Sequence, residues 1–242
     1  MTSGQVPGPR RRVAVRETRD EARAVRTFVL EFASGETLPF HPGQFLRVRF
    51  PGSPEWREYA ISSPPPARGG LEITLNLAGS FTERMFALKP GDALEVEGPM
   101  GDWHYTDEGR PIVLVSGGTG IAPFRSLIGH LLERGLPHPV SVFYSARTPA
   151  DIVFRQELET YARRGVAVFT TITRPDQMAP GERWDGRVGR LTPALIAESA
   201  PRFGESVFYL CGPGPLVRAM RDGLLGKGVE PGRLRTETWG EF

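Results

Sequence analysis

A glycine loop between an apolar run and a helical pattern is the strongest chemical feature of this sequence. Residues 112–115 are four consecutive apolar residues, which is typical of a strand buried on both faces. Gly117, Gly118 and Gly120 follow, and Pro123 stands where the first turn of a helix would begin. The N–H groups of such a loop, with the positive end of the helix dipole, favour a phosphate. The segment predicts a nucleotide site, although ligand-free turns of this kind also occur and Pro123 replaces the third glycine of the usual dinucleotide motif.

A second group of residues suited to ligand binding lies at 57–63 and 79–82. Arg57 could bind a phosphate through two hydrogen bonds, and Tyr59, on the same strand face, could lay its ring against a planar ligand. Ser62 and Ser63 add hydroxyls where that strand ends. Residues 79–82, Gly-Ser-Phe-Thr, open a short helix whose first N–H groups form another anion site. An edge strand with a surface arginine and an ordinary helix cap would give the same pattern.

A third feature is the single cysteine, which follows an apolar run at 207–210 and precedes Gly212 and Pro213. In a doubly wound sheet the carboxyl ends of neighbouring parallel strands meet at the ligand crevice. Cys211 is therefore expected beside the glycine loop. Most lone cysteines are small buried apolar residues, so the predicted position is what singles this one out.

The elements that must position these residues follow two different patterns. From Val13 to about Trp103, apolar and polar residues alternate with period two between Pro-Gly and Gly-Gly turns, which predicts an antiparallel β-barrel or sandwich. After Pro111, strands expected at 112–116, 140–145, 166–172, 206–211 and 233–238 alternate with helices expected at 123–134, 153–163, 192–199 and 214–226. That alternation predicts a doubly wound parallel α/β sheet. The predicted organisation is a flexible tail over 1–12, a barrel domain over 13–108 and an α/β domain over 109–242.

Composition excludes several other classes of protein. The 242 residues carry 30 Lys and Arg against 28 Asp and Glu, a net charge of +2 that gives no case for nucleic-acid binding. One cysteine rules out an intramolecular disulfide and a Cys-ligated iron–sulfur cluster on this chain, and the four scattered histidines predict no zinc or other metal site. No apolar run approaches the ~20 residues of a membrane span, and the first residues lack the apolar core of a signal peptide. The expected setting is the cytoplasm, away from the membrane.

Taken in order, these motifs resemble those of the ferredoxin–NADP reductase family of flavoenzymes, in the stand-alone form without an iron–sulfur domain. The resemblance covers nearly the whole chain after the tail. The matching segments are Arg57-x-Tyr59-Ala60-x-x-Ser63, the Pro-Gly-Gln-Phe of 42–45, Gly79-x-x-Thr82, the Gly-Thr-Gly-Ile-Ala-Pro of 118–123 and Cys211-Gly212-Pro213. Pro123 departs from the usual dinucleotide motif, but a proline at this position is what the corresponding motif of this family contains.

The resemblance implies a fold, cofactors and site residues. FAD, rather than FMN, is expected between the two domains, and hydride is expected to pass from NAD(P)H to the flavin. The implied flavin-binding residues are Arg57, Tyr59, Ala60, Ile61, Ser62, Ser63, Asn76, Gly79, Ser80, Phe81, Thr82 and Trp239. The implied nucleotide-binding residues are Gly118, Thr119, Gly120, Ile121, Pro123, Cys211, Gly212 and Pro213. Cys211 and Glu237 are the implied catalytic residues, although Trp239 could instead pack on the last strand.

One departure from the family pattern concerns the flavin. The family usually has Ser or Thr near flavin N5, where this chain has Ala60. A hydrogen bond to the reduced flavin is therefore either missing or supplied by Ser62 or a backbone N–H.

The choice between NADPH and NADH depends on arginines after two of the strands. Arg147 follows the strand at 140–145, and Thr173 and Arg174 follow the next strand. No acidic residue stands where the ribose hydroxyls would be bound, and a nearby Arg suits a 2′-phosphate. This pattern favours NADPH over NADH, although Arg147 and Arg174 could be ordinary surface residues.

The predicted function is a flavin-dependent NAD(P)H reductase that passes single electrons to a separate protein, such as a ferredoxin, a flavodoxin or an oxygenase component. Two alternatives remain open from the sequence. The chain could be an electron-transfer subunit of a larger redox complex. It could also be a non-enzymatic nucleotide-binding module whose flavin site has decayed, which Ala60 would explain.

Overall fold

The computed structural model describes residues 8–32, 35–67 and 70–239. The chain divides into two compact units, residues 1–105 with 122–130, and residues 106–121 with 131–242. Most of helix α2 (Ala122–Glu133) thus groups with the first unit, which a simple alternation of strands and helices does not indicate. The limits 13–108 and 109–242 remain predictions.

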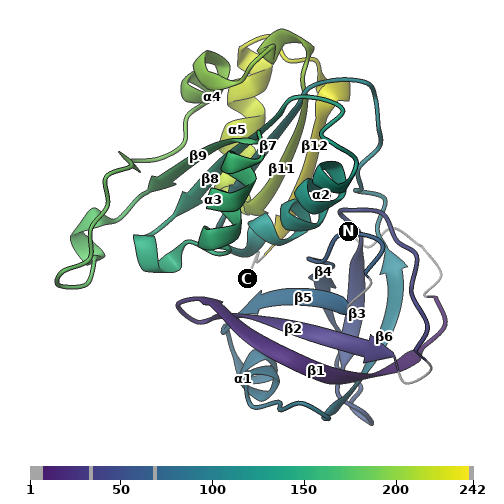
Figure 1. The fold of residues 1–242 in the computed structure, drawn as a ribbon. Helices are drawn as coiled ribbons and strands as arrows, with labels where there is room; N and C mark the ends of the chain where they lie inside the picture. The colour runs from purple at the N-terminus through teal and green to yellow at the C-terminus, as the bar shows by residue number, and fades with distance from the viewer. Residues whose placement is uncertain (1–7, 33–34, 68–69, 240–242) are drawn as a thin grey trace. The chain divides into compact units, whose positions relative to one another are not determined.

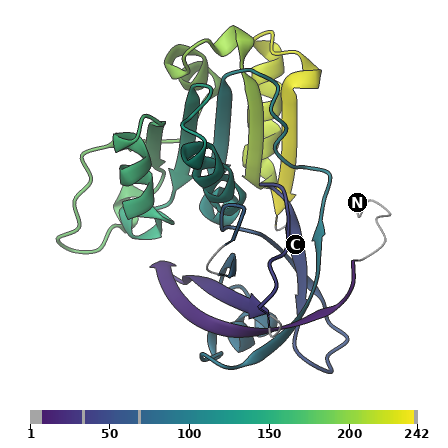
Figure 2. The same ribbon diagram turned by 45° about the vertical axis from the view of Figure 1, so that its right-hand side comes forward.

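The first unit is a six-stranded antiparallel sheet curled into a half-barrel, as the period-two pattern predicts. Its sheet order is β4-β3-β6-β1-β2-β5. The elements are β1 (Arg11–Ala22), β2 (Val25–Phe32), β3 (Phe45–Arg49), β4 (Arg57–Ala60), β5 (Leu71–Asn76), α1 (Ser80–Phe86) and β6 (Ala93–Met100). Register shifts after Val15 and Asp20 interrupt β1, and bulges of this kind bend a strand. Figure 2 shows β1 in purple curving strongly.

The first strand begins earlier in the chain than the sequence pattern predicts. β1 begins at Arg11, two residues inside the segment predicted as a flexible tail. Residues 1–7 of that segment lie outside the described part of the chain.

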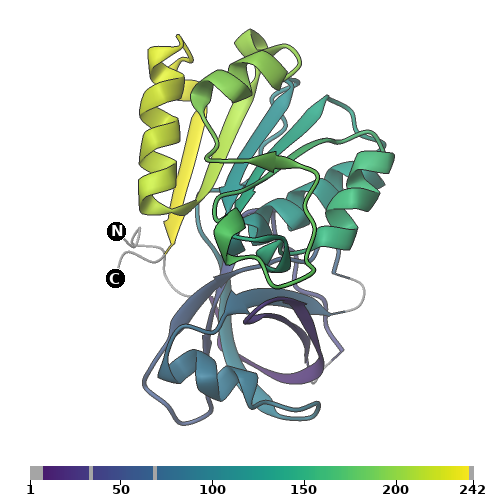
Figure 3. The ribbon, with the colours of Figure 1, turned by 90° about the vertical axis from the view of Figure 1, so that its left-hand side faces the viewer.

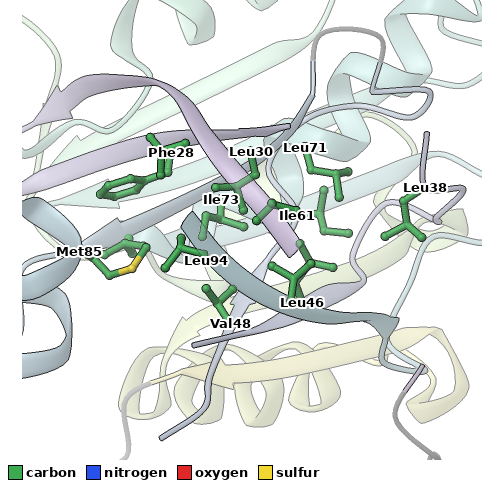
Figure 4. Packing of buried hydrophobic residues seen from close by; sticks show 14 of the residues in the cluster. Phe28, Leu30, Leu38, Leu46, Val48, Ile61, Leu71, Ile73, Met85 and Leu94 are labelled. Carbon is green, nitrogen blue, oxygen red and sulfur yellow. The ribbon is translucent and has the colours of Figure 1, made fainter. Parts of the chain in front are cut away.

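The barrel core follows from alternation along these strands. Phe28 and Leu30 on β2 and Ile73 on β5 are fully buried, and they meet Met85 from helix α1, which lies at one end of the barrel (Figure 1). Figure 4 shows this cluster with Leu46 and other strand residues around it. Each such side chain contributes ~1.5–3 kcal/mol when it is removed from water. With Leu71, Ile73 and Leu75 in the cluster, the inward face of β5 is fixed, and Tyr59 of β4 packs against the same core.

The second unit is a parallel six-stranded sheet in the order β10-β9-β8-β7-β11-β12. Its strands are β7 (Ile112–Gly117), β8 (Val140–Ala146), β9 (Ala167–Ile172), β10 (Arg187–Val188), β11 (Val207–Pro213) and β12 (Leu234–Trp239). The α-helices are α2 (Ala122–Glu133), α3 (Arg155–Arg163), α4 (Pro193–Ser199) and α5 (Gly214–Gly226). Short 3₁₀ helices are η1 (Gly118–Ile121), η2 (Pro149–Asp151), η3 (Pro175–Gln177), η4 (Phe203–Glu205) and η5 (Pro231–Arg233).

Helices cover both faces of this sheet. Figure 3 shows the strands between α5 on one side and α3 on the other. Val115 and Leu210 point toward the α4–α5 side, where they pack with Val217 and Met220. Their neighbours along the strands, including Ser116 and Cys211, therefore point to the opposite face. This alternation confirms the predicted doubly wound architecture.

The described helices were also searched for membrane spans. Within residues 8–32, 35–67 and 70–239, none is both long enough and apolar enough to cross a bilayer.

Candidate functional site

The glycine loop lies where β7 ends, in contact with the end of β11. A Cβ added at Gly120 would lie 2.5 Å from the Cys211 carbonyl oxygen and 2.7 Å from the Gly212 Cα, so only glycine fits there. Gly118 has φ +56°, is exposed, and has no atom within 4 Å of the position a Cβ would take. The loop is thus packed against protein at one glycine and open at another. An open backbone with N–H groups at a helix start suits a phosphate.

A row of three polar side chains crosses the sheet beside this loop. Ser116 on β7 pairs in register with Cys211 on β11, and Cys211 pairs with Glu237 on β12. Residues in register on adjacent parallel strands project from the same face of the sheet. Ser116 and Cys211 are fully buried, while Glu237 is partly exposed. The structure therefore brings together the two residues expected to be catalytic.

Ser116 was missed by the sequence reasoning. Its Oγ is buried and has no hydrogen-bond partner in the part of the chain that the structure describes. An unpaired buried hydroxyl costs about 1–3 kcal/mol, so a ligand group able to bond it would be favoured. The available signal was a polar residue ending an otherwise apolar run, directly before the glycines.

Three more of the predicted contacts, Gly212, Pro213 and Trp239, lie one or two residues beyond this polar row on β11 and β12. Gly212 has φ +148°, and a Cβ there would lie 3.1 Å from the Gly117 nitrogen. Pro213 pairs in register with Trp239. The side chain of Trp239 lies outside what the structure describes, so its contact with flavin stays a prediction.

Two arginines meet at the carboxyl ends of β8 and β9. The Arg174 N–H donates to the Arg147 carbonyl at 2.8 Å, and both the N–H and the Oγ1 of Thr173 donate to the Ala146 carbonyl. Both arginine side chains are exposed. Nearby, Asp151 accepts hydrogen bonds from the N–H and Oγ1 of Thr148 at 3.0 and 2.7 Å. That carboxylate is committed to the cap of η2, whereas both guanidinium groups are exposed.

In the first unit, strand β4 and the start of α1 bring the predicted flavin residues together. The Arg57 guanidinium carbon lies 5.6 Å from the Phe81 ring centroid, and the Tyr59 ring centroid lies 6.3 Å from it. Arg57 is exposed and forms an ion pair with Glu55. Burial raises the pKa of Tyr59 to about 12, against the lowering effect of Arg57. Tyr59 therefore remains a neutral phenol at any physiological pH.

The Thr82 hydroxyl is hydrogen-bonded within the turn that opens α1. The Thr82 Oγ1 accepts a hydrogen bond from the Ala78 N–H at 2.7 Å and donates to the Gly79 carbonyl at 2.8 Å. Asn76, Gly79 and Ser80 are exposed. A phosphate here would meet exposed backbone at Gly79, while the Thr82 hydroxyl proton is already used within the turn.

The segment that follows β4 places its two serine hydroxyls against β5. Ser62 and Ser63 are buried, as are Ala60 and Ile61. The Ser62 Oγ lies 2.9 Å from the Thr74 Oγ1, and the Ser63 Oγ accepts from the Glu72 N–H at 3.1 Å. This geometry argues against Ser62 as the replacement for the hydroxyl that Ala60 lacks. A backbone N–H remains as the other alternative.

An ion cluster behind this turn was not foreseen from the sequence. The Arg125 Nη1 donates to the Ser62 carbonyl at 3.0 Å and pairs with Glu72, and the Arg19 Nη2 lies 2.6 Å from the Glu72 Oε1. Burial raises the pKa of Glu72, but Arg125 and Arg19 together lower it below its ordinary value. The cluster thus fixes an ionised carboxylate behind the segment that follows β4.

Comparisons with known proteins agree with both halves of this description. Residues 12–105 match the model of the oxidoreductase FAD-binding domain, and residues 114–222 match that of the oxidoreductase NAD-binding domain. The chain is 28% identical over 228 residues to the toluate 1,2-dioxygenase electron transfer component of Pseudomonas putida, covering 93% of this chain and 66% of that protein. It is 32% identical over 222 residues to the glycine betaine monooxygenase reductase subunit of Pseudomonas aeruginosa, covering 89% and 60%.

A solved structure extends the similarity to the whole fold. The flavohem-like FAD/NAD-binding domain of the nitric oxide dioxygenase from Vibrio cholerae superposes with a TM-score of 0.84 at 26% identity, covering 97% of this chain and all of that one. The chain spans about two thirds or less of the length of the curated relatives named above.

Proposed function

We propose that this chain, which belongs to the ferredoxin–NADP reductase-like family of oxidoreductases with an FAD-binding and an NAD-binding domain, takes electrons from NADPH and passes them singly to a separate protein. As a family member it is an FAD- and NAD(P)-dependent reductase module. When bound, the flavin would supply the conversion between a two-electron donor and a one-electron acceptor. The task of the chain's own residues is to bind and align the partners of that exchange.

The observation that carries this proposal is the polar row beside the glycine loop. Gly118 and Thr119 would bind the pyrophosphate through backbone N–H groups, which places the nicotinamide end of the same ligand within reach of the neighbouring strand ends. Ser116, Cys211 and Glu237 lie in register there. Their side chains would orient the nicotinamide ring, and the burial of Ser116 and Cys211 would keep water away from it.

The preference for NADPH rests on Arg147 and Arg174. The two residues are joined by a backbone hydrogen bond and their side chains are exposed, so both guanidinium groups are available to a 2′-phosphate. Removing either one is expected to raise the KM for NADPH about tenfold, the value of one charge-assisted hydrogen bond, and to leave the KM for NADH unchanged. The variants are Arg147→Ala and Arg174→Ala, measured with both nucleotides.

Arg163→Ala is the matched control for this experiment. Arg163 is exposed at the end of α3, where it donates to Thr160. This variant should leave both KM values unchanged. Equal effects of the Arg147 and Arg174 variants on NADH and NADPH would contradict a 2′-phosphate site.

The proposed acceptor is a small redox protein, namely a ferredoxin, a flavodoxin or the oxygenase component of a multicomponent system. The two curated relatives described above are an electron transfer component and a reductase subunit by name. With one cysteine, this chain cannot ligate a Cys-bound cluster of its own. Stopped-flow mixing of the NADPH-reduced protein with each carrier should show rapid one-electron transfer to at least one of them. Transfer to none, while ferricyanide is still reduced, would refute a protein acceptor of these classes.

A further inference from the structure

Tyr144 links the glycine loop to the segment that precedes α3. It lies on β8 with no exposed surface. Its hydroxyl donates a hydrogen bond to the Gly118 carbonyl at 3.1 Å and accepts one from the Val153 N–H at 3.2 Å. A carbonyl can only accept and an amide N–H can only donate, so the direction of both bonds is fixed. One buried hydroxyl thus connects two segments that follow different strands.

The bond to Gly118 also sets the direction of the next amide. A trans peptide is planar, and its C=O and N–H groups point in opposite directions. Because the Gly118 carbonyl points toward the buried hydroxyl, the N–H of Thr119 points away from it. Thr119 is in the first turn of η1, where an amide has no acceptor within the helix. Gly118 is exposed, so this amide lies at the open part of the loop.

We propose that Tyr144 is a positioning residue for nucleotide binding: its hydroxyl fixes the Gly118–Thr119 peptide so that the Thr119 N–H is presented to the pyrophosphate of NAD(P)H. This inference rests on the proposed function of the loop and adds a side chain that contacts no ligand. A preset donor binds an anion better than a mobile one because no ordering cost is incurred on binding.

The state of the phenol supports this role. Burial raises the pKa of Tyr144, and Asp151 raises it further, against a lowering effect of the Val153 amide. The hydroxyl therefore keeps its proton across the physiological range and remains a donor to Gly118. The positioning is independent of pH in that range.

The test compares Tyr144→Phe with a matched control, Tyr161→Phe. Tyr161 on α3 is also largely buried, but its hydroxyl donates to Glu157 instead of to the loop. Inorganic pyrophosphate and NADPH are titrated into each flavin-loaded protein, with backbone amide NMR shifts and flavin absorbance as readouts. Tyr144→Phe should weaken both ligands about five- to tenfold, with kcat at saturating NADPH and flavin content unchanged. Tyr161→Phe should match the wild type throughout.

The wild-type protein supplies a readout that does not depend on the variant's folding. Pyrophosphate should shift the Thr119 amide and slow its hydrogen exchange; if it shifts other amides and not Thr119, the inference is overturned. Unchanged affinities in a folded Tyr144→Phe would overturn it as well. If pyrophosphate binds at Thr119 but neither NADPH nor NADH reduces the flavin, the reductase proposal fails while the role of Tyr144 stands. If the flavin is reduced and Tyr144→Phe binds like the wild type, only the role of Tyr144 fails.

Discussion

Glu72 shows how a single residue can stabilise a turn through both its side chain and its backbone. Its carboxylate pairs with Arg19 and Arg125, its N–H donates to the Ser63 Oγ, and its carbonyl accepts from the Ser62 N–H at 2.8 Å. The two arginines lower the pKa of the carboxyl although burial acts to raise it. Ionised Glu72 therefore favours the folded state.

Glu72→Gln should lower the free energy of unfolding by about 1–3 kcal/mol at pH 7. The guanidinium groups of Arg19 and Arg125 would lose the carboxylate with which both of them pair. The folded pKa lies below its unfolded value of about 4.3, so this stabilisation is present above that pH and is lost as the pH falls through the folded pKa. Denaturant unfolding at pH 7 and near pH 3.5 measures the difference. Glu31→Gln, at an exposed position of β2, should change stability by less than about 0.5 kcal/mol. If the difference in unfolding free energy between the wild type and Glu72→Gln is the same at both pH values, the ionised carboxylate is not what stabilises the fold.

The sequence identified individual residues unevenly. Cys211 and Glu237 could be singled out because strand ends and family motifs locate them, and the register places them side by side. Ser116 and Arg125 could not. Arg125 acts through Glu72, far away in the chain, and such a pairing has no local pattern. Ser62 carried a motif position, yet its hydroxyl is hydrogen-bonded to Thr74 on β5.

At the scale of elements, the strand–loop–helix unit from β7 to α2 depends on close backbone approach. Gly120 meets the backbone of Cys211 and Gly212, which cannot move aside as a flexible side chain can. The glycine loop is therefore positioned by the end of β11 as much as by β7.

Gly120→Ala should displace the loop from β11 and cost roughly 2 kcal/mol or more in unfolding free energy, since overpacking forces the backbone to shift. NADPH binding should weaken in parallel, as measured by titration of the flavin spectrum. Gly204→Ala is the matched control, because a Cβ there meets no atom within 4 Å and its φ is not in the left-handed region. If Gly120→Ala behaves like Gly204→Ala in both measurements, the close approach does not control the loop.

Element types followed closely from periodicity, and their ends less so. The predicted strands at 112–116 and 140–145 correspond to β7 and β8 within one residue. The helix predicted from 153 begins at Arg155, because Phe154 adopts φ +57° and cannot continue a right-handed helix. Strand β10 has two exposed residues, too few for any alternation to be visible.

At the scale of the whole molecule, the order of a barrel and an α/β domain was predictable, because the change of periodicity near Pro111 is sharp. The grouping of residues 122–130 with the first unit was not, since it follows from tertiary contacts such as Arg125 with Glu72. The electron acceptor has no local signal either. The choice of acceptor depends on how the surface of this chain fits the surface of another protein, which no local sequence pattern describes.

The proposed function makes this chain a flavoenzyme reduced by a pyridine nucleotide. The most direct measurement is anaerobic stopped-flow absorbance of the FAD-loaded protein mixed with NADPH or with NADH. Rapid bleaching of the flavin bands is expected, with NADPH effective at lower concentration than NADH. A protein that binds no added FAD, or whose bound flavin is bleached by neither nucleotide, would contradict the account.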